Sequence, residues 1–455
     1  MAHEHHSEVG QSRGAGNGAL AASGYGLGAN AGFSPRELHL AIRIDNYGQA
    51  AECFGLRYAD RLADAVCASL RGLGESGQID RAVVLHAGDG WVQAVFASEG
   101  GDCLPLVHAC CVVTATTPIS VGRGKIVPVL SFGMPPLGAA IDGRDRDAAL
   151  LRAARAVLEG EADGACGQVT ASSPAFHEQD MAVAADLLLA VREGGLPLVW
   201  QSVRDAHESG NILYREARLR KIDGQGISPT VGDAIQAAER VGCVAALDCC
   251  VVSRVLDELQ ADPDVRLGVN ISARSARLSF WWTELLARLR ADRSLASRLF
   301  IEITETAPLP RIGDVVAFAD CLRGLGCRIV IDNFGVGYSS IRTIMALRPD
   351  AVKVDAFYLK RASKTETDRR TYDHLVGLAA TLAGTVIAKG VESAEDSELA
   401  CDAGAYWQQG DHQGAPSLGR SWIPDRRNDQ IAALEQFRDA CRRGGSSGQM
   451  RGYAA

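Results

Sequence analysis

The sequence lacks the features that mark several large classes of protein. Its 455 residues hold no run of about 18 to 20 apolar residues, so no membrane-spanning helix is expected. No charged head followed by an apolar core opens the chain, so we expect no signal peptide and a cytoplasmic protein. The formal net charge of −8 argues against nucleic-acid binding, which needs an excess of basic residues. The 13 cysteines include no Cys-x-x-Cys pair and indicate neither a zinc site nor a disulfide framework.

The two ends of the chain show little hydrophobic periodicity. Residues 1–34 are rich in Gly, Ala and Ser, which predicts a flexible tail. Residues 426–455 are predicted to hold one helix, Asp429–Arg443, followed by a second flexible tail. Between the ends, a change of rhythm predicts two domains, at 35–172 and 180–425.

The first of these segments mixes strand-like and helix-like stretches. The turn Ala87-Gly-Asp-Gly90 separates two strands, because glycine accepts the positive φ that such turns need. The predicted elements are strands within 36–46, 104–116 and 127–133, strands Arg81–His86 and Trp91–Ala97, and helices near 55–73, 146–160 and 178–194. This order of elements predicts an α/β unit.

From about residue 196, short apolar strands alternate with helices. The predicted strands are Leu196–Val203, Ile212–Leu219, Arg266–Ser272, Leu299–Thr304, Arg328–Asp332, Ala351–Asp355, Thr385–Gly390 and a segment near 404–409. Eight strands in this rhythm predict a (β/α)₈ barrel. A doubly wound open sheet is the alternative, but no Gly-rich phosphate-binding fingerprint follows any strand.

Polar side chains recur at the ends of these strands. They are Glu216, Asn270, Glu302, Asp332, Lys353 and Lys389, with Gln409 near the last strand. One such residue is usually a helix cap, but active sites of these barrels lie at the carboxyl ends of the strands. Carboxylate and amide oxygens suit a hard cation such as Mg²⁺ or Mn²⁺, and a neighbouring lysine can position an anion or a metal-bound water. The pattern predicts a metal-assisted phosphate site.

The motifs around these residues resemble those of EAL domains, which hydrolyse or bind cyclic di-GMP, a bacterial second messenger. They are Glu216-Ala-Arg-Leu-Arg220, Val269-Asn-Ile-Ser-Ala-Arg274, Phe300-Ile-Glu-Ile-Thr-Glu305, Ile331-Asp-Asn-Phe-Gly-Val-Gly-Tyr-Ser-Ser340, Val352-Lys-Val-Asp355 and Ala388-Lys-Gly-Val-Glu392. They occur in family order over roughly residues 180 to 425, and Gln201 matches the glutamine that opens these domains.

The EAL resemblance implies a role for each matching residue. It assigns metal ligation to Glu216, Asn270, Glu302 and Asp332, and water orientation in catalysis to Lys353. It assigns nucleotide contacts to Gln201, Arg220, Lys353, Glu392 and Gln409, and stabilisation of the loop after the Asp332 strand to Glu305. It also implies Mg²⁺ or Mn²⁺ as cofactor, a homodimer, and signalling to a further protein partner.

Three positions depart from the EAL pattern. Arg218 replaces leucine, Asn333 replaces the second aspartate of the metal strand, and Lys389 replaces the glutamate that serves the attacking water. These changes shift the site toward positive charge, so one metal site is expected and a second is not. A lysine ammonium cannot accept the proton of that water. Three interpretations of Lys389 remain open. Its ammonium fills the place of the second metal, or the substitution arose by drift in a site that is no longer used and the lysine forms a salt bridge with Glu392 or Asp332. In the third, some hydrolysis survives the substitution.

The first domain resembles a GGDEF domain, the diguanylate cyclase fold, which commonly precedes EAL. The resemblance rests on topology, the turn at residues 87–90, Ile44-Asp-Asn-Tyr47 and Asp60. Arg43 and Gly90 stand where the family has metal ligands, and Ala51 where it has a guanine-contacting asparagine. We therefore expect no cyclase activity.

The sequence leaves three functions to compare. The favoured one is a receptor that binds cyclic di-GMP at the barrel mouth with little or no hydrolysis. The second is a phosphodiesterase that converts cyclic di-GMP to the linear dinucleotide pGpG. The third is an interaction scaffold that binds no nucleotide.

Overall fold

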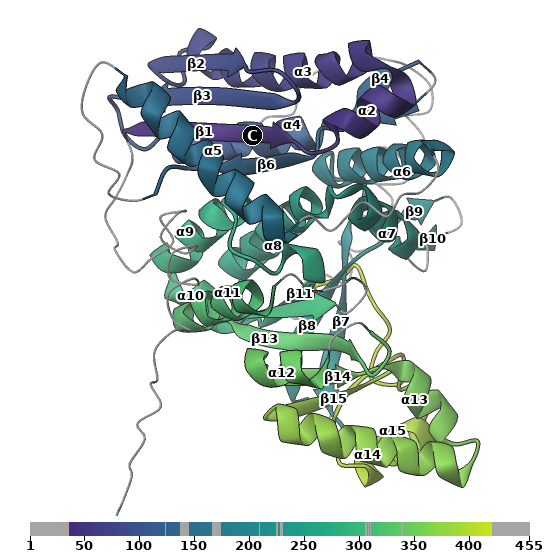
Figure 1. Cartoon of the computed structure of the whole chain (residues 1–455). Helices are drawn as coiled ribbons and strands as arrows, with labels where there is room; N and C mark the ends of the chain where they lie inside the picture. The colour runs from purple at the N-terminus through teal and green to yellow at the C-terminus, as the bar shows by residue number, and fades with distance from the viewer. Residues whose placement is uncertain are drawn as a thin grey trace, which may run out of the picture.

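The computed structural model of the chain describes residues 36–122, 124–136, 145–165, 174–208, 210–223, 226–227, 231–304, 307, 309, 311–337 and 340–420. Both predicted tails, and the helix predicted at Asp429–Arg443, lie outside these residues. A four-stranded sheet with helices on both faces is followed by a closed eight-stranded barrel (Figure 1). The predicted fold class, an α/β sandwich followed by a barrel, is therefore confirmed.

The N-terminal sheet has the strand order β2-β3-β1-β6, and all its pairs are antiparallel. Its strands and the adjoining hairpin are β1 (Glu37–Ile44), β2 (Arg81–His86), β3 (Trp91–Ala97), β4 (Ile119–Val121), β5 (Gly124–Ile126) and β6 (Leu130–Gly133). Its helices are α2 (Tyr47–Phe54), α3 (Leu56–Glu75), α4 (Leu104–Ala115), α5 (Arg146–Ala165) and α6 (Pro174–Arg192). Helix α5 crosses one face very closely, since a Cβ on Gly133 would lie 2.1 Å from the Ala154 carbonyl oxygen.

The prediction of a strand within residues 104–116 is wrong, because these residues form helix α4. The segment is apolar along its whole length, so periodicity does not separate a buried helix from a buried strand. Its twelve residues exceed the usual length of a strand, and Pro105 lies in the first turn, where a missing N–H costs nothing. Both features favour a helix.

The barrel closes in the order β11-β12-β13-β14-β15-β16-β7-β8. Its strands are β7 (Leu198–Asp205), β8 (Ile212–Leu219), β11 (Leu267–Ser272), β12 (Leu299–Thr304), β13 (Arg328–Phe334), β14 (Ala351–Val354), β15 (Thr385–Lys389) and β16 (Trp407–Gln409). Strand β7 runs antiparallel to both of its neighbours, β8 and β16. The connection from β7 to β8 is too short for the helical crossover that parallel strands require.

Helices surround the barrel, and two short strands form a hairpin beside it. They are β9 (Ile222–Asp223), β10 (Gly226–Ile227), α7 (Gly232–Val241), α8 (Val244–Ala261), η1 (Ala273–Ser275), η2 (Phe280–Trp282), α9 (Thr283–Ala291), α10 (Arg293–Arg298), α11 (Ile312–Leu325), α12 (Ile341–Leu347), α13 (Ala356–Ala362), α14 (Glu366–Leu382) and α15 (Ala394–Asp402). Within the described residues, no helix combines the length and apolarity needed to cross a bilayer.

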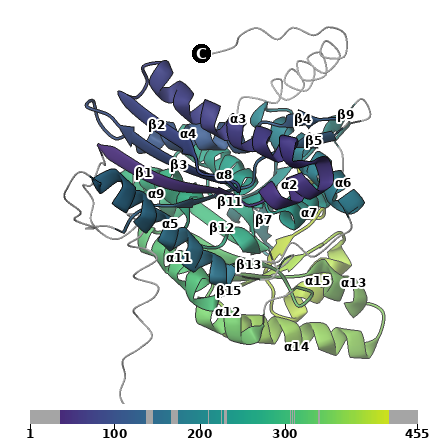
Figure 2. The ribbon, with the colours of Figure 1, turned by 45° about the horizontal axis from the view of Figure 1, so that its top comes forward.

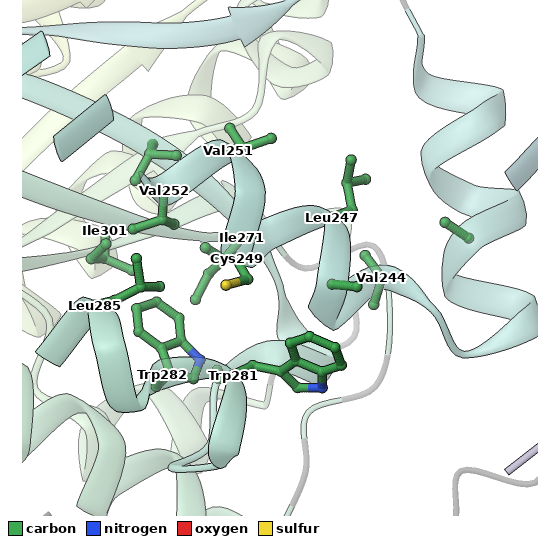
Figure 3. Close-up of a cluster of buried hydrophobic side chains, with 14 of the residues drawn as sticks. Val244, Leu247, Cys249, Val251, Val252, Ile271, Trp281, Trp282, Leu285 and Ile301 are labelled. Carbon is green, nitrogen blue, oxygen red and sulfur yellow. The ribbon is translucent and has the colours of Figure 1, made fainter. Parts of the chain in front are cut away.

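The sheet and the barrel share one continuous hydrophobic core. Phe132 of β6 stacks on Phe280 of η2 with ring centroids 4.2 Å apart, and His108 Nε2 lies 3.3 Å from the Trp281 carbonyl oxygen. Burial lowers the pKa of His108 to about 4, so this imidazole is neutral near pH 7. Figure 3 shows the barrel side of this core, where Trp281 and Trp282 lie near side chains of α8 and α9. Helix α6 packs on both α7 and α8 (Figure 2).

Candidate functional site

Polar side chains fill the C-terminal half of the barrel interior. Strand register brings them to one level: Asn270 of β11 lies opposite Glu302 of β12, and Gln201 of β7 lies opposite Glu216 of β8. In the same way Lys389 of β15 lies opposite Gln409 of β16. Successive residues of a strand point to opposite faces, so these alternate positions share the inner face of the barrel.

Lys353 lies at the centre of this site and has no exposed surface. Its Nζ donates to Glu216 Oε2 at 2.8 Å and to Glu302 Oε2 at 2.6 Å. Burial works against the ammonium, but the two carboxylates raise the pKa of Lys353 above its ordinary value. The side chain is therefore a fixed buried cation between two acids.

The two acids bound by Lys353 differ in their surroundings. Glu216 also accepts hydrogen bonds from Gln409 Nε2 and Asn270 Nδ2, each at 2.6 Å. Its burial is outweighed by Lys353 and Arg218, which hold the pKa of Glu216 well below its usual range. Burial instead raises the pKa of Glu302 to about 7, although Lys353 acts in the opposite direction. Glu302 is consequently the acid of this pair that takes up a proton first.

Lys389 extends from the end of β15 to the neighbouring acid. Its Nζ donates to Asp332 Oδ1 and to Asn333 Oδ1, both at 2.6 Å. The sequence left open whether Lys389 pairs with Glu392 or with Asp332, and in the structure it pairs with Asp332. Glu392 instead accepts a hydrogen bond from Lys360 Nζ at 2.6 Å on the surface. Asn333 has φ of 61°, a conformation that asparagine tolerates better than most residues.

Arg218 enters the same site from β8. Its Nη1 donates to Gln201 Oε1 at 2.7 Å, and its Nε lies 3.3 Å from Glu216 Oε1. The guanidinium thus forms an ion pair with Glu216, a contact that the sequence analysis did not predict. Arg220, two residues on, donates to the adjacent Leu219 carbonyl oxygen at 2.9 Å.

Most of the predicted site residues converge. The structure brings together Gln201, Glu216, Asn270, Glu302, Asp332, Lys353 and Gln409. Glu392 makes its contact on the surface, and Glu305 lies outside the described residues.

Tyr214 lies beneath the acids and was missed in the sequence. It is fully buried, and its ring centroid lies 5.9 Å from Lys353 Nζ. Gly268 leaves room for it, since a Cβ there would lie 2.5 Å from the Tyr214 ring and 2.7 Å from Glu302 Oε1. The sequence did contain an indication of this position: Tyr214 and Glu216 are two residues apart, which places both side chains on the same face of the strand.

Each of the three acids at the barrel mouth lies in a site that also holds a cationic group. The carboxylates of Glu216, Glu302 and Asp332 are met by three cationic groups, from Lys353, Lys389 and Arg218. Such balance is needed because an uncompensated buried charge costs several kcal/mol.

The same residues offer few free ligands for a divalent cation. Asn270 Oδ1 and Glu302 Oε1 are buried and accept no hydrogen bond from the described part of the chain, so they are free oxygen ligands. Among the described residues, however, no three His, Cys, Asp or Glu side chains are grouped so as to hold a metal. The ammonium of Lys389 occupies Asp332 Oδ1. The site therefore fits one divalent cation at most.

The turn at residues 87–90 of the N-terminal sheet has a different construction. Asp89 and the glycines on either side of it have positive φ, and Trp91 N donates to the Gly88 carbonyl oxygen at 2.8 Å. A Cβ on Gly90 would lie 2.7 Å from Tyr47 Cβ, so the turn has no room for a longer residue there. Arg43 Nε pairs with Asp45 Oδ1 at 2.5 Å.

Comparisons with known proteins give a family for the barrel and several similar proteins. The family model described as EAL domain matches residues 184–416. The cyclic di-GMP phosphodiesterase PdeL of Escherichia coli is 28 % identical over 159 residues, 35 % of this chain and 44 % of that protein. The bifunctional diguanylate cyclase/cyclic di-GMP phosphodiesterase MucR of Pseudomonas aeruginosa is 24 % identical over 388 residues, 83 % of this chain and 55 % of that protein. A solved S helix-GGDEF-EAL structure of LapD from Vibrio cholerae has a TM-score of 0.46 at 18 % identity, covering 83 % of this chain and 89 % of that one.

The chain thus spans about half the length of these two curated relatives. The matched family model runs from α6 past β16 and includes every strand of the barrel. It also covers slightly more than half of the 455 residues. On this evidence, the chain belongs to the EAL domain family.

Proposed function

We propose that the barrel mouth is a receptor site for cyclic di-GMP and hydrolyses it very weakly or not at all. The relatives' names connect this family to cyclic di-GMP. The convergence of Gln201, Asn270 and Gln409 around the acids supports a retained ligand site. A scaffold without a ligand would have no need for so many buried polar groups, which are costly to bury.

The charge balance of the mouth is the observation that carries this proposal. Relative to the EAL pattern, Asn333 adds one unit of positive charge, Lys389 adds two and Arg218 adds one. The total of four equals the charge of two divalent cations. The side chains of this protein therefore supply the positive charge that two metal ions supply in the family pattern, and a second metal would be repelled.

The same arrangement explains why hydrolysis is weak. A phosphodiester is cleaved by an attacking water that must lose a proton, and Lys389 is a donor at the position expected to accept it. A missing general base typically lowers the rate by about 10²- to 10⁴-fold. Lys389 and Arg218 instead provide two cations for the phosphates of the ligand.

A slow phosphodiesterase is the second candidate, and one observation favours it. Of the four predicted metal ligands, Asn270 and Glu302 have free buried oxygens, Oδ1 and Oε1, and these two residues would be the first to hold one Mg²⁺ or Mn²⁺. When bound, such an ion polarises the phosphoryl oxygen and lowers the pKa of water. Lys353 keeps both neighbouring acids in place for this role.

The N-terminal domain, proposed to span 35–172, is a GGDEF-like domain without cyclase activity. The two positions that would hold metal are Arg43 and Gly90, and neither carries a carboxylate. Arg43 is instead paired with Asp45, and Tyr47 leaves no room for a side chain at Gly90. The proposed EAL domain, 180–425, also offers a surface for the homodimer that the resemblance implies. Its exposed apolar residues near the Asp332 strand are Val336, Ile341, Met345 and Phe357.

The test measures cyclic di-GMP binding by calorimetry, in EDTA and in Mn²⁺, and pGpG formation by chromatography. We expect the parent to bind in EDTA without forming pGpG, and Lys389→Ala to bind about tenfold more weakly. The triple variant Arg218→Leu, Asn333→Asp, Lys389→Glu restores the family charges and should form pGpG only with metal. Lys364→Glu, a charge change at an exposed lysine outside the mouth, is the matched control.

Each alternative has its own outcome. Formation of pGpG by the parent, lost in Glu216→Ala, would show that the protein is a phosphodiesterase. An absence of binding in EDTA and in Mn²⁺ would leave the scaffold. If Lys389→Ala bound as tightly as the parent, Lys389 would not hold the ligand.

A further inference from the structure

The barrel interior is apolar at the end opposite the mouth. A separate hydrophobic cluster fills it, formed by the buried residues Val203, Tyr214, Phe300, Val330, Ala351 and Ile387, with Leu213 and Trp407 partly buried. These side chains come from the N-terminal halves of the parallel strands and from the C-terminal half of the antiparallel strand β7. The interior is thus divided into a charged half and an apolar half, and Tyr214 lies at the boundary.

A cavity of about 310 Å³ opens at this apolar end. Leu213, Phe300 and Trp407 provide apolar walls, and Arg266, Arg328 and Asp350 provide charges. Pockets for small molecules commonly combine aromatic walls with a few placed polar groups, and this volume lies at the lower limit of their usual size. The cavity differs from the mouth in having no buried acid among its lining residues.

The charges around this cavity leave an excess of one positive unit. The Arg328 guanidinium carbon lies 5.9 Å from the centre of the Phe300 ring, and its Nη1 lies 3.8 Å from Asp350 Oδ1. Asp350 is already engaged elsewhere, since its Oδ2 accepts from Ile329 N at 2.8 Å and lies 3.9 Å from Arg323 Nε. Arg266 lines the same cavity. Two arginines and one aspartate favour a ligand with one negative charge.

We propose that this cavity binds a planar aromatic monocarboxylate. The aromatic part would pack against Leu213 and Trp407, which are only partly buried, and the carboxylate would be met by Arg266 and Arg328, whose flat guanidinium groups suit a carboxylate. One face of Phe300 is already stacked on Tyr214, with centroids 4.3 Å apart and an interplanar angle of 20°. This pair separates the ligand from Lys353, so the site is distinct from the mouth and does not depend on the function proposed for it.

The probe is 2-naphthoate, and binding is followed by calorimetry and by ligand-observed NMR on the full chain. Acetate lacks the ring, and 2-naphthylmethanol lacks the charge, so both should bind at least about tenfold more weakly. Arg328→Gln and Trp407→Leu should each weaken naphthoate binding about tenfold. Arg348→Gln is the matched control, because this exposed arginine lies near Asp320 and does not line the cavity.

Four results would overturn the proposal. They are no binding of 2-naphthoate to the parent, equal binding of the neutral alcohol, unchanged binding in Arg328→Gln, and displacement of naphthoate by cyclic di-GMP, which would place the probe in the mouth. Circular dichroism of Trp407→Leu separates lost binding from lost folding. If Trp407→Leu unfolds, the test rests on Arg328→Gln, which changes an exposed side chain.

Discussion

The barrel mouth and the region beside the turn at residues 87–90 both contain ion pairs, but they differ in how deeply the charges are buried. At the mouth, Glu216 and Glu302 are almost fully buried and share one lysine. Beside the turn, the Arg43 and Asp45 side chains are 28 % and 29 % exposed. Water can compensate a lost charge at the turn but not at the mouth. Charge at the mouth can therefore change only together with an opposite change nearby.

The largest effect is expected for Lys353→Met. It would leave Glu216 and Glu302 buried without their cation, which typically costs about 3–5 kcal/mol of the free energy of unfolding. Denaturant unfolding followed by circular dichroism measures this loss. Lys360→Met removes an exposed lysine from its pair with Glu392 and should cost less than about 0.5 kcal/mol.

A loss below about 1 kcal/mol in Lys353→Met would contradict the contrast between the two regions. Such a result would mean that the acids of the mouth are reached by water or neutralised by protons, as exposed groups are. Adding Glu216→Gln to Lys353→Met should recover part of the loss, because Glu216 is the acid whose low pKa keeps it ionised.

Asp248 of α8 is a buried acid, and no lysine of the described residues compensates its charge. Burial raises the pKa of Asp248 to about 7, although it accepts a hydrogen bond from Ser272 N at 2.9 Å. The folded state therefore holds this proton up to about pH 7, while the unfolded chain releases it near pH 4. Stability from this group is lost as the pH rises from about 4 to 7.

The variant Asp248→Asn keeps an acceptor for Ser272 N and has no charge to bury. We expect its stability relative to the parent to increase by about 2–4 kcal/mol between pH 4 and pH 8. Denaturant unfolding at both pH values measures this difference. A difference that stays constant with pH would show that Asp248 is ionised at no cost in the folded state.

The sequence predicted the positions of most site residues but not their partners. Glu216, Asn270, Glu302 and Lys353 could be found because each falls near the carboxyl end of a short apolar strand. The partner of Lys389 could not be chosen from the sequence. Glu392 is three residues away in the chain and Asp332 is fifty-seven residues away, and only the closed barrel shows that Lys389 binds Asp332.

The fold was predicted in the same uneven way. Alternation and turns located most strands, but α4 was misassigned because an all-apolar segment carries no periodic signal. The antiparallel direction of β7 follows from its short connection to β8 and could have been inferred. The contact of Arg218 with Glu216 depends on side-chain conformation, which no sequence pattern specifies.

At the turn, an intermediate effect is expected from adding one methyl group. Gly88 and Gly90 have similar positive φ, 84° and 77°, but only Gly90 faces Tyr47 at a distance shorter than contact. Gly90→Ala should therefore be less stable than Gly88→Ala by about 1–3 kcal/mol, the usual cost of overpacking. Thermal unfolding of the two variants compares them directly. Equal losses would mean that the backbone conformation alone requires glycine, and that Tyr47 can move.

The smallest effect is expected for the hydrogen bond that fixes Tyr47. Its hydroxyl donates to Asp60 Oδ1 at 2.6 Å, and this bond raises the pKa of Tyr47 to about 12. Because the pair is partly exposed, water replaces much of what is lost when either partner is removed. A double-mutant cycle with Tyr47→Phe and Asp60→Asn should give a coupling energy of about 0.5–1 kcal/mol. A coupling as large as that of a buried ion pair would mean that the turn region is as closed to solvent as the mouth.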